Sequence, residues 1–212
     1  MPLFYSENIE LTTQIGMWKI NESESELANG LELSKDALTR LSKRRSKVHR
    51  KGYLAIRKLL KSHNIQPLNH KYDKNGAPYL TDGRHLSISH SNDIAAIAIS
   101  SKPVGIDLEY FHEKIVRIAP RFLHLKESLD LKKNKDIHYL SQIWTAKEAL
   151  YKAFRKPGLN FSKQILIDQL EDNSKEGIGS IIYRDSVKKY KLYFRYFDGF
   201  CLGLATTNNN NK

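Results

Sequence analysis

Three stretches of the chain carry apolar residues at the spacing of an α-helix. In residues 34–64, leucines and other apolar residues recur at roughly helical spacing, no proline interrupts them, and the polar face is densely basic. A similar pattern runs through residues 115–131, and a stronger one through residues 137–154. A period near 3.6 residues is typical of amphipathic helices, so the pattern predicts a helix in each stretch.

Shorter runs have the alternating or continuously apolar character of strands. Residues 86–89 alternate and residues 94–99 are apolar throughout, which predicts two neighbouring strands. A third strand is predicted at residues 104–109. The last part of the chain adds four more, at residues 164–170, 178–183, 191–197 and 200–205, with the hairpin signal Asp198-Gly199 between the final two.

The order of these elements is helix, strands, helix, strands, which predicts an α+β fold made of two similar α/β subdomains that meet near Val104. We place them at residues 1–103 and 104–207, followed by a frayed tail at residues 208–212. No sequence repeat links the halves, so the duplication is inferred from element order alone.

Composition narrows the classes of function. The chain has 212 residues, of which 40% are apolar, so a folded core is expected. Lys and Arg outnumber Asp and Glu by 35 to 23, and the formal charge of +12 points to a polyanionic partner. No segment reads as a membrane span or secretion signal, so we expect a cytoplasmic protein with no membrane partner.

The cysteine count excludes two kinds of site. Cys201 is the one cysteine in the chain, so an internal disulfide and a multi-cysteine zinc site are both ruled out. It falls within the predicted strand at residues 200–205, where we expect an inert core thiol.

Two acidic residues stand two apart in the predicted strand at residues 104–109. Side chains at this spacing share one face of a strand, so Asp107 and Glu109 lie side by side while Ile106 and Leu108 point to the other face. Adjacent carboxylates repel, and a hard cation relieves the repulsion. The alternative is an exposed polar face on an edge strand.

The predicted helix at residues 137–154 contains a third carboxylate beside a lysine. At helical spacing Trp144, Glu148, Tyr151 and Lys152 fall on one stripe. A simple ion pair between Glu148 and Lys152 is one interpretation. Together with the acidic pair, the stripe also provides what metal-assisted phosphoryl transfer needs.

A serine and a histidine occur together in the run Ser87-Ile88-Ser89-His90-Ser91. Neighbouring strand residues point to opposite faces, so Ser89 and His90 cannot serve each other as nucleophile and base. A hydroxyl, an imidazole and backbone amides at a strand end suit phosphate binding better. His90 taken alone also fits a structural role.

In combination, these segments resemble the 4′-phosphopantetheinyl transferases of the longer, surfactin-synthetase-activating (Sfp) type. The resemblance covers about 80 residues in the middle of the chain. It rests on four short motifs in order: Asn75-Gly76-Ala77-Pro78, Leu86 to Ser91, Val104 to Glu109, and Trp144 to Lys152, the last against the family pattern W-x-x-K-E-x-x-x-K.

The resemblance implies an activity and its central residues. Coenzyme A would give its phosphopantetheine arm to a serine hydroxyl of an acidic apo acyl or peptidyl carrier protein, and adenosine 3′,5′-bisphosphate would leave. Asp107, Glu109 and Glu148 would hold Mg²⁺ against the pyrophosphate. Glu148 would also take the serine proton, and Lys152 would stabilise charge on the pyrophosphate. Asp107, Glu148 and Lys152 are therefore the predicted catalytic residues.

The same resemblance implies coenzyme contacts. Ser89 and His90 would meet the phosphates of coenzyme A, with His90 at the 3′-phosphate. Arg50 stands where the family has a coenzyme-binding arginine, with Arg45 and Lys43 as helpers. Lys152 also belongs to this set.

One departure from the family concerns a phosphate-binding lysine. The family's Gly-Lys-Pro is Gly76-Ala77-Pro78 in this chain, so the lysine is absent. We expect Lys74, beside Gly76, to supply the missing charge. The substitution bears on coenzyme affinity more than on the chemical step.

Chain length bears on assembly. The longer family members resemble two short units fused into a pseudo-dimer, with the active site in the cleft between the halves. A monomer is therefore expected to suffice.

Two alternatives from other classes remain open. A magnesium-dependent nuclease also needs carboxylates and a lysine, although the one acid-x-Lys sequence nearby lies at residues 130–132, in a helical stretch. A basic nucleic-acid-binding protein would use the run Lys43 to Lys47 with Arg50 and Lys51, but that run lacks aromatics for base stacking. We therefore expect no nucleic-acid partner.

Overall fold

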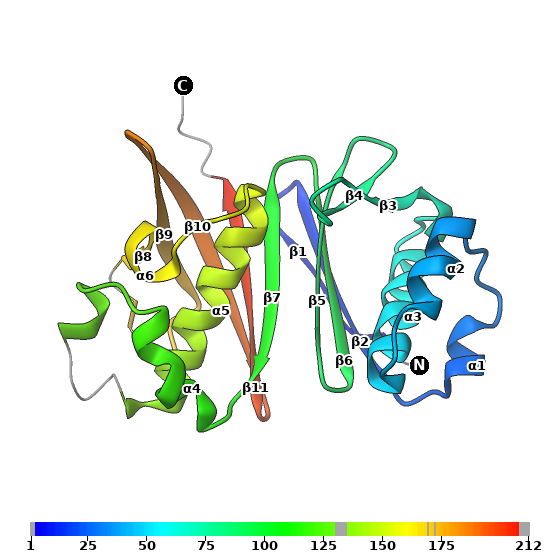
Figure 1. Ribbon diagram of the computed structural model, residues 1–212, viewed down its shortest axis with the longest axis horizontal. Helices are drawn as coiled ribbons and strands as arrows, with labels where there is room; N and C mark the ends of the chain where they lie inside the picture. The colour runs from blue at the N-terminus through cyan, green and yellow to red at the C-terminus, as the bar shows by residue number, and fades with distance from the viewer. Residues whose placement is uncertain (1–2, 130–134, 169, 172, 208–212) are drawn as a thin grey trace. The chain divides into compact units, whose positions relative to one another are not determined.

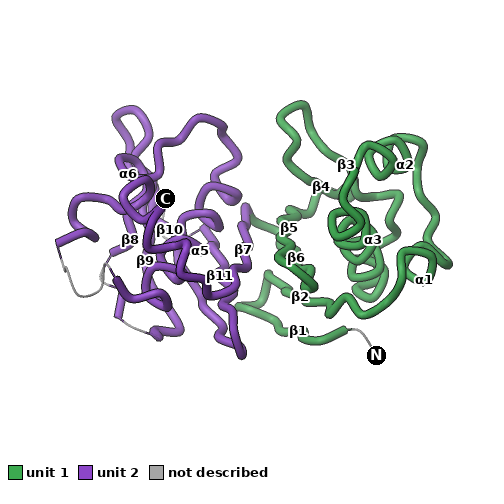
Figure 2. Tube along the Cα trace, turned by 60° about the horizontal axis from the view of Figure 1, so that its bottom comes forward, with its two compact units in different colours: residues 1–102 green, residues 103–212 purple. Residues whose placement is uncertain are grey.

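A computed structural model describes residues 3–129, 135–168, 170–171 and 173–207. The chain divides into two compact units, residues 1–102 and residues 103–212 (Figure 2). The predicted tail at residues 208–212 lies outside the described residues.

Unit 1 combines an antiparallel sheet with three helices. The sheet has the strand order β1-β2-β6-β5, and β3 and β4 form a separate two-stranded sheet (Figure 1). In chain order its elements are β1 (Leu3–Ile9), β2 (Thr13–Lys19), α1 (Glu24–Ala28), α2 (Lys35–Ser42), α3 (Lys47–Ser62), the 3₁₀ helix Pro67–Asn69, β3 (His70–Tyr72), β4 (Pro78–Leu80), β5 (His85–Ser91) and β6 (Ile94–Ser100).

The core of unit 1 lies between the sheet and α3. Leu54 and Leu59 of α3 are fully buried, and they belong to one apolar cluster with Ile97 of β6 and Trp18 of β2. Sequence reasoning had no role for Trp18, and its burial in this cluster accounts for it.

Unit 2 is built around a longer sheet with the order β7-β11-β10-β9-β8. The sheet pairs are antiparallel. In chain order its elements are β7 (Val104–Tyr110), α4 (Lys114–Ile118), the 3₁₀ helices Ala119–Arg121 and Glu127–Leu129, α5 (Ile137–Phe154), α6 (Phe161–Gln164), β8 (Ile165–Asp168), β9 (Glu176–Tyr183), β10 (Ser186–Phe197) and β11 (Phe200–Thr207).

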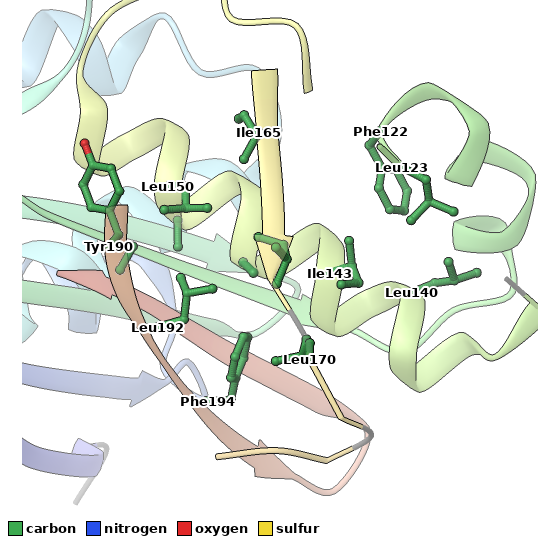
Figure 3. Packing of buried hydrophobic residues seen from close by; sticks show 14 of the residues in the cluster. Phe122, Leu123, Leu140, Ile143, Leu150, Ile165, Leu170, Tyr190, Leu192 and Phe194 are labelled. Atoms are coloured by element: carbon green, nitrogen blue, oxygen red, sulfur yellow. The ribbon is translucent and has the colours of Figure 1, made fainter. Parts of the chain in front are cut away.

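Helix α5 packs across the sheet of unit 2. Figure 3 shows Ile143 and Leu150 of α5 in one apolar cluster with Leu192 and Phe194 of β10. The helix begins where the Asp136 carboxylate accepts a hydrogen bond from the Tyr139 backbone, and such caps stabilise helix starts. This packing holds one face of α5 against β7 and β11.

The structure confirms the predicted strands after residue 85 and the helix at residues 137–154. It differs at residues 34–64, where α2 and α3 replace one helix, because Ser46 is extended and breaks the helical run. It differs again at residues 115–131, where α4 ends at Ile118, just before the Pro120 turn, and residues 130–131 lie outside the description.

Strands β1 and β2 were not predicted from the sequence. In β1 the inward positions include Glu7 and an exposed position carries Phe4, so apolar and polar residues do not alternate along the sequence although burial does. In β2, Gly16 interrupts the apolar pattern, and the ring of His63 lies where a side chain at that position would stand. The fold is therefore a mixed α/β fold with several sheets, as predicted, with an additional N-terminal hairpin. Among the described residues, no helix is long and apolar enough to cross a membrane.

Candidate active site

Strand β7 presents its acidic residues to helix α5. Asp107 is buried at 4% exposure, and its Oδ1 accepts a hydrogen bond of 2.6 Å from Nζ of Lys152 on α5. The same Nζ donates to the carbonyl oxygen of Ile106 at 3.1 Å. Lys152 therefore links the last turn of α5 to β7, and its positive charge compensates the carboxylate of Asp107.

Glu109 lies two residues along on the same strand and is held by the indole of α5. Nε1 of Trp144 donates to Oε1 of Glu109 at 3.0 Å. Burial and the nearby charge of Asp107 raise the pKa of Glu109 to about 7, against the opposing effects of Trp144 and Lys152. This carboxyl group therefore holds its proton to a higher pH than an ordinary glutamate does.

Glu148 on α5 completes the acidic group. Burial and then the charge of Asp107 raise the pKa of Glu148 to about 7, Lys152 opposes the rise, and Glu109 adds to it. The three carboxyl groups and Lys152 thus lie within electrostatic reach of one another in unit 2. Within the described ranges, no three His, Cys, Asp or Glu side chains stand in an arrangement that would hold a metal ion.

Two glycines allow α5 to approach the sheet this closely. A Cβ atom on Gly105 of β7 would lie 1.9 Å from the carbonyl oxygen of Ala149, which is backbone and can move only together with α5. Gly203 of β11 is the register partner of Asp107, and a Cβ there would lie 2.9 Å from Cγ2 of Thr145. The glycine of Val104-Gly105-Ile106-Asp107 therefore sets the distance between strand and helix.

The other lysine of the Trp144 to Lys152 motif, Lys147, is buried in the core, whereas Lys152 is partly exposed. Lys147 is fully buried, and its Nζ donates to the carbonyl oxygens of Phe122, Phe161 and Ile165. It also pairs with Glu127 at 2.7 Å. Sequence reasoning assigned no role to this pair, and the long separation of the partners left no local signal for it.

Glu127 anchors the segment between α4 and α5. Its Oε2 accepts from the backbone N–H of His124 at 2.7 Å, and its Oε1 accepts from that of Ile167 at 2.8 Å. The buried pair therefore fastens residues 119–129 to α5 and to the edge strand β8.

Cys201 lies on β11 as the register partner of Glu109. Its sulfur is 3.3 Å from Oγ1 of Thr145, and burial raises the pKa of the thiol to about 12. The thiol is buried in the core, as expected.

Except for Lys152 on α5, the predicted coenzyme-binding residues belong to unit 1. His90 and Ser89 occupy the end of β5, on opposite faces as expected. The imidazole of His90 lies over Gly52 of α3. Burial and then the charge of His49 lower the pKa of His90, so the ring is neutral at pH 7.

Arg50 is engaged by an acidic residue of α1. Its Nε donates to both carboxylate oxygens of Glu24 at 2.9 Å, and Nη1 donates to the carbonyl oxygens of Arg44 and Arg45. The side chain of Glu26 caps α1 by accepting from the Ser23 backbone at 2.7 Å. The acidic patch at residues 22–26, which sequence reasoning left unexplained, therefore fixes α1 and the α2–α3 connection.

The loop that lacks the family's lysine is closed by an aspartate. Oδ1 of Asp73 accepts from the backbone N–H groups of Asn75 and Ala77 at 2.8 and 2.9 Å. Gly76 has a φ of 82°, which favours glycine. Lys74 is exposed at the loop tip, and Arg45 is exposed on the α2–α3 connection.

A cavity of about 270 Å³ lies beside the β5–β6 turn of unit 1. It is lined by Ile20, Val48, Lys51, Asn92 and Asp93. The acid-x-Lys sequence considered for a nuclease, at residues 130–132, lies outside the described residues.

Comparison with known proteins identifies relatives of this chain. Residues 103–205 match the family model described as ACPS, 4′-phosphopantetheinyl transferase superfamily. The chain is 38% identical over 111 residues to 4′-phosphopantetheinyl transferase gsp of Aneurinibacillus migulanus, a match that covers 50% of this chain and 47% of the relative.

Two further relatives come from Bacillus subtilis. One 4′-phosphopantetheinyl transferase is 33% identical over 106 residues, covering 49% of this chain and 46% of the relative. The transferase Sfp of strain 168 is 35% identical over 85 residues, covering 39% of this chain and 38% of the relative.

The chain thus spans about half, or less, of the length of these curated relatives. The family match contains β7 and α5, and with them all four residues of the carboxylate–lysine group. Over residues 103–205 this chain is therefore similar to the 4′-phosphopantetheinyl transferase superfamily, the family that its motifs resemble.

Proposed function

We propose that this protein transfers the 4′-phosphopantetheine group of coenzyme A to a serine hydroxyl of an acidic apo acyl or peptidyl carrier protein and releases adenosine 3′,5′-bisphosphate. The names of its relatives support the reaction class. The observation that carries the proposal is the group of Asp107, Glu109, Glu148 and Lys152, brought together by β7 and α5 in the matched region.

The proposed reaction is one displacement at phosphorus. The serine oxygen forms a bond to the phosphorus that carries the pantetheine arm, and the bond from that phosphorus to the bridging oxygen of the pyrophosphate breaks. Glu148 takes the serine proton, a role that suits a carboxyl group with a pKa of about 7. Lys152 stabilises negative charge on the departing bisphosphate.

Magnesium fits the chemistry of the donor set, although the three carboxyl groups do not stand in a metal-holding arrangement in the structure described here. Carboxylate oxygens are the ligands that Mg²⁺ prefers, and Asp107, Glu109 and Glu148 supply them. Their mutual repulsion contributes to the raised pKa values of Glu109 and Glu148, and a cation relieves such repulsion. When bound, the ion would offset the charge of the pyrophosphate. Lys152 provides that compensation to Asp107 in the structure described here.

Apart from Lys152 in unit 2, the residues proposed to bind coenzyme A belong to unit 1. Ser89 and His90 would meet the phosphates, with Arg45, Lys74 and Gly76 nearby in the bound complex. Arg50 would act together with the α2–α3 connection, because its side chain donates hydrogen bonds to the carbonyl oxygens of Arg44 and Arg45. Arg45 and Lys74 are included for their positive charge, and the other assignments follow positions that the family uses.

The family resemblance also suggests the architecture of the whole enzyme. We expect the two units to be related subdomains of a pseudo-dimer, with the active site in the cleft between them. The working form would be a cytoplasmic monomer.

Coenzyme A binding tests the proposal without knowledge of the carrier. Calorimetry with coenzyme A and Mg²⁺ should show saturable binding, and undetectable binding would refute the assignment. A magnesium-dependent cleavage of DNA without coenzyme binding would support the nuclease alternative.

Transfer itself is measured as a mass gain of one phosphopantetheine on an apo carrier. Glu148→Gln and Asp107→Ala should abolish the gain. Glu176→Gln is the matched control, because Glu176 is exposed on β9, away from the group. Equal activity of Glu148→Gln and this control would contradict the proposed role.

A further inference from the structure

Helix α3 contains a glycine whose missing side chain is replaced by a histidine ring from another element. An ideal Cβ on Gly52 would lie 2.5 Å from Cδ2, 2.5 Å from Nε2 and 2.8 Å from Cε1 of His90. These are the three nearest atoms, and they belong to one ring. Gly52 is buried within α3, where alanine would form a better helix.

We propose that Gly52 is a positioning residue for coenzyme binding: it lets the imidazole of His90 lie against the backbone of α3. This inference rests on the proposed function. It adds a role in that function for Gly52, which has no side chain and lies outside all four motifs.

The surroundings of the ring explain why its position matters. His49 in the first turn of α3 is close enough for its charge to affect His90. Lys51, which precedes Gly52, and Asn92, which follows the strand of His90, both line the 270 Å³ cavity. Asp93 also lines this cavity and pairs with Lys19 at 2.6 Å. Holding the ring at α3 therefore places it beside a hollowed part of unit 1 where Lys51 offers a positive charge to a phosphate group.

Neither element that carries the contact can move easily. Gly52 lies in a 16-residue helix whose neighbours Leu54 and Ala55 are fully buried. His90 is in register with Ala95 of β6, within a paired sheet. A methyl group at position 52 would therefore displace the ring rather than the backbone, since the ring can turn about its side-chain bonds by giving up its hydrogen bond to the Asn92 backbone.

A double-mutant cycle tests the contact. Gly52→Ala should lower the urea midpoint of unfolding in the wild-type background. In the His90→Ala background the same change should have no effect or raise the midpoint, because the atoms that would clash are gone. Additive effects of Gly52→Ala in the two backgrounds would overturn the proposal.

The second measurement is specific for coenzyme binding. Gly52→Ala should raise the KM for coenzyme A about tenfold, as expected when one charge-assisted hydrogen bond is lost, and should leave kcat within about twofold. The KM for dephospho-coenzyme A, which lacks the 3′-phosphate, should change little. An equal rise for both substrates would overturn the proposed link to the 3′-phosphate.

A matched control exists in the same unit. A Cβ on Gly16 would lie 2.5 Å from Cε1 of His63, so Gly16→Ala also pushes on an imidazole ring. We expect Gly16→Ala to lower the unfolding midpoint and to leave the KM for coenzyme A unchanged. A rise in KM equal to that of Gly52→Ala would show a general structural effect and overturn the positioning role.

The ring can also be observed directly. In Gly52→Ala the imidazole should move toward solvent, so an NMR titration of the His90 Cε1 proton should show its pKa rising toward 6.5. An unchanged titration would overturn the proposal. A further outcome is that the double-mutant cycle shows the Gly52–His90 contact while wild-type protein binds no coenzyme A. In that case the proposed function fails, and with it the role of Gly52 in coenzyme binding.

Discussion

Two lysines on α5, five residues apart, have different surroundings and should have different mutant phenotypes. Lys147 is buried among carbonyl oxygens and pairs with Glu127. Lys152 is partly exposed and pairs with Asp107. The first stabilises the fold, and the second belongs to the proposed active site.

Lys152→Met should reduce catalysis more than folding. Loss of the charge that would stabilise the departing bisphosphate should lower kcat by about 10²-fold to 10³-fold. Steady-state formation of holo-carrier measures this. The exposed Lys163 of α6 provides the control, and a similar loss in Lys163→Met would argue against a specific role.

Lys147→Met should reduce stability. Removing one partner leaves Glu127 buried without its cation, which typically costs about 3–5 kcal/mol of unfolding free energy. Urea denaturation measures the loss. The double variant Lys147→Met/Glu127→Gln should recover part of it, and no recovery would mean that the pair is not the cause.

His70 should make the protein less stable in acid. Burial and then the charges of Arg57 and Arg40 lower the pKa of His70 to about 3, so the folded protein keeps the ring neutral. The unfolded chain takes up this proton below pH 6.5. The contribution of His70 to the free energy of unfolding is fully present above pH 6.5 and decreases as the pH falls from 6.5 to 3. The total decrease is at most about 5 kcal/mol.

The comparison that isolates His70 uses His70→Gln, which does not titrate. Urea midpoints of both proteins between pH 7 and 4 should diverge, because only the wild-type protein carries this proton linkage. Parallel curves would show that the histidine titrates normally.

At the scale of elements, the close packing of α5 on β7 is the critical contact. Gly105→Ala would drive a methyl group into the backbone of Ala149, so α5 must shift away from the sheet. We expect a loss of about 1–3 kcal/mol in unfolding free energy and a fall in kcat, because Lys152 moves from Asp107.

Gly177→Ala on β9 is the matched control for this prediction. Its added methyl group would lie 3.0 Å from Cδ1 of Leu170, the end of a flexible side chain. This variant should keep its activity. Full activity in Gly105→Ala would contradict the importance of the strand–helix distance.

Local patterns predicted those elements whose signal lies within one segment. Strand β7 and helix α5 have clear periodicity, so the acidic pair and the Glu148 stripe were found from spacing alone. Asp198-Gly199 predicted the turn of β10 and β11 in the same way. The break between α2 and α3 was missed because no proline or glycine marks Lys43 to Ser46.

Long-range pairs were outside the reach of sequence reasoning. The pairing of Glu127 with Lys147 and that of Glu24 with Arg50 join segments about 20 or more residues apart. Nothing local distinguishes these charges from solvated ones. The contact of Gly52 with His90 could not be predicted for the same reason. It depends on a missing side chain, and a glycine in a helix does not show which residue fills the space.

At the scale of the whole molecule, net charge should govern encounter with the carrier. With a formal charge of +12, the protein should attract an acidic partner, and salt should screen this attraction. At saturating coenzyme A, the KM for the carrier should rise about tenfold between 50 and 500 mM NaCl, with kcat nearly constant. A KM for the carrier that does not change with NaCl concentration would argue against electrostatic docking.

The buried thiol of Cys201 has a practical consequence. With a pKa of about 12 and no solvent access, it is almost never a thiolate at neutral pH, so it should resist maleimide reagents and mixed disulfides with the cofactor's own sulfur. Fluorophores can therefore be attached at cysteines introduced on each unit without first removing the native one. Energy transfer between such labels would measure the distance between residues 1–102 and 103–212 with and without coenzyme A.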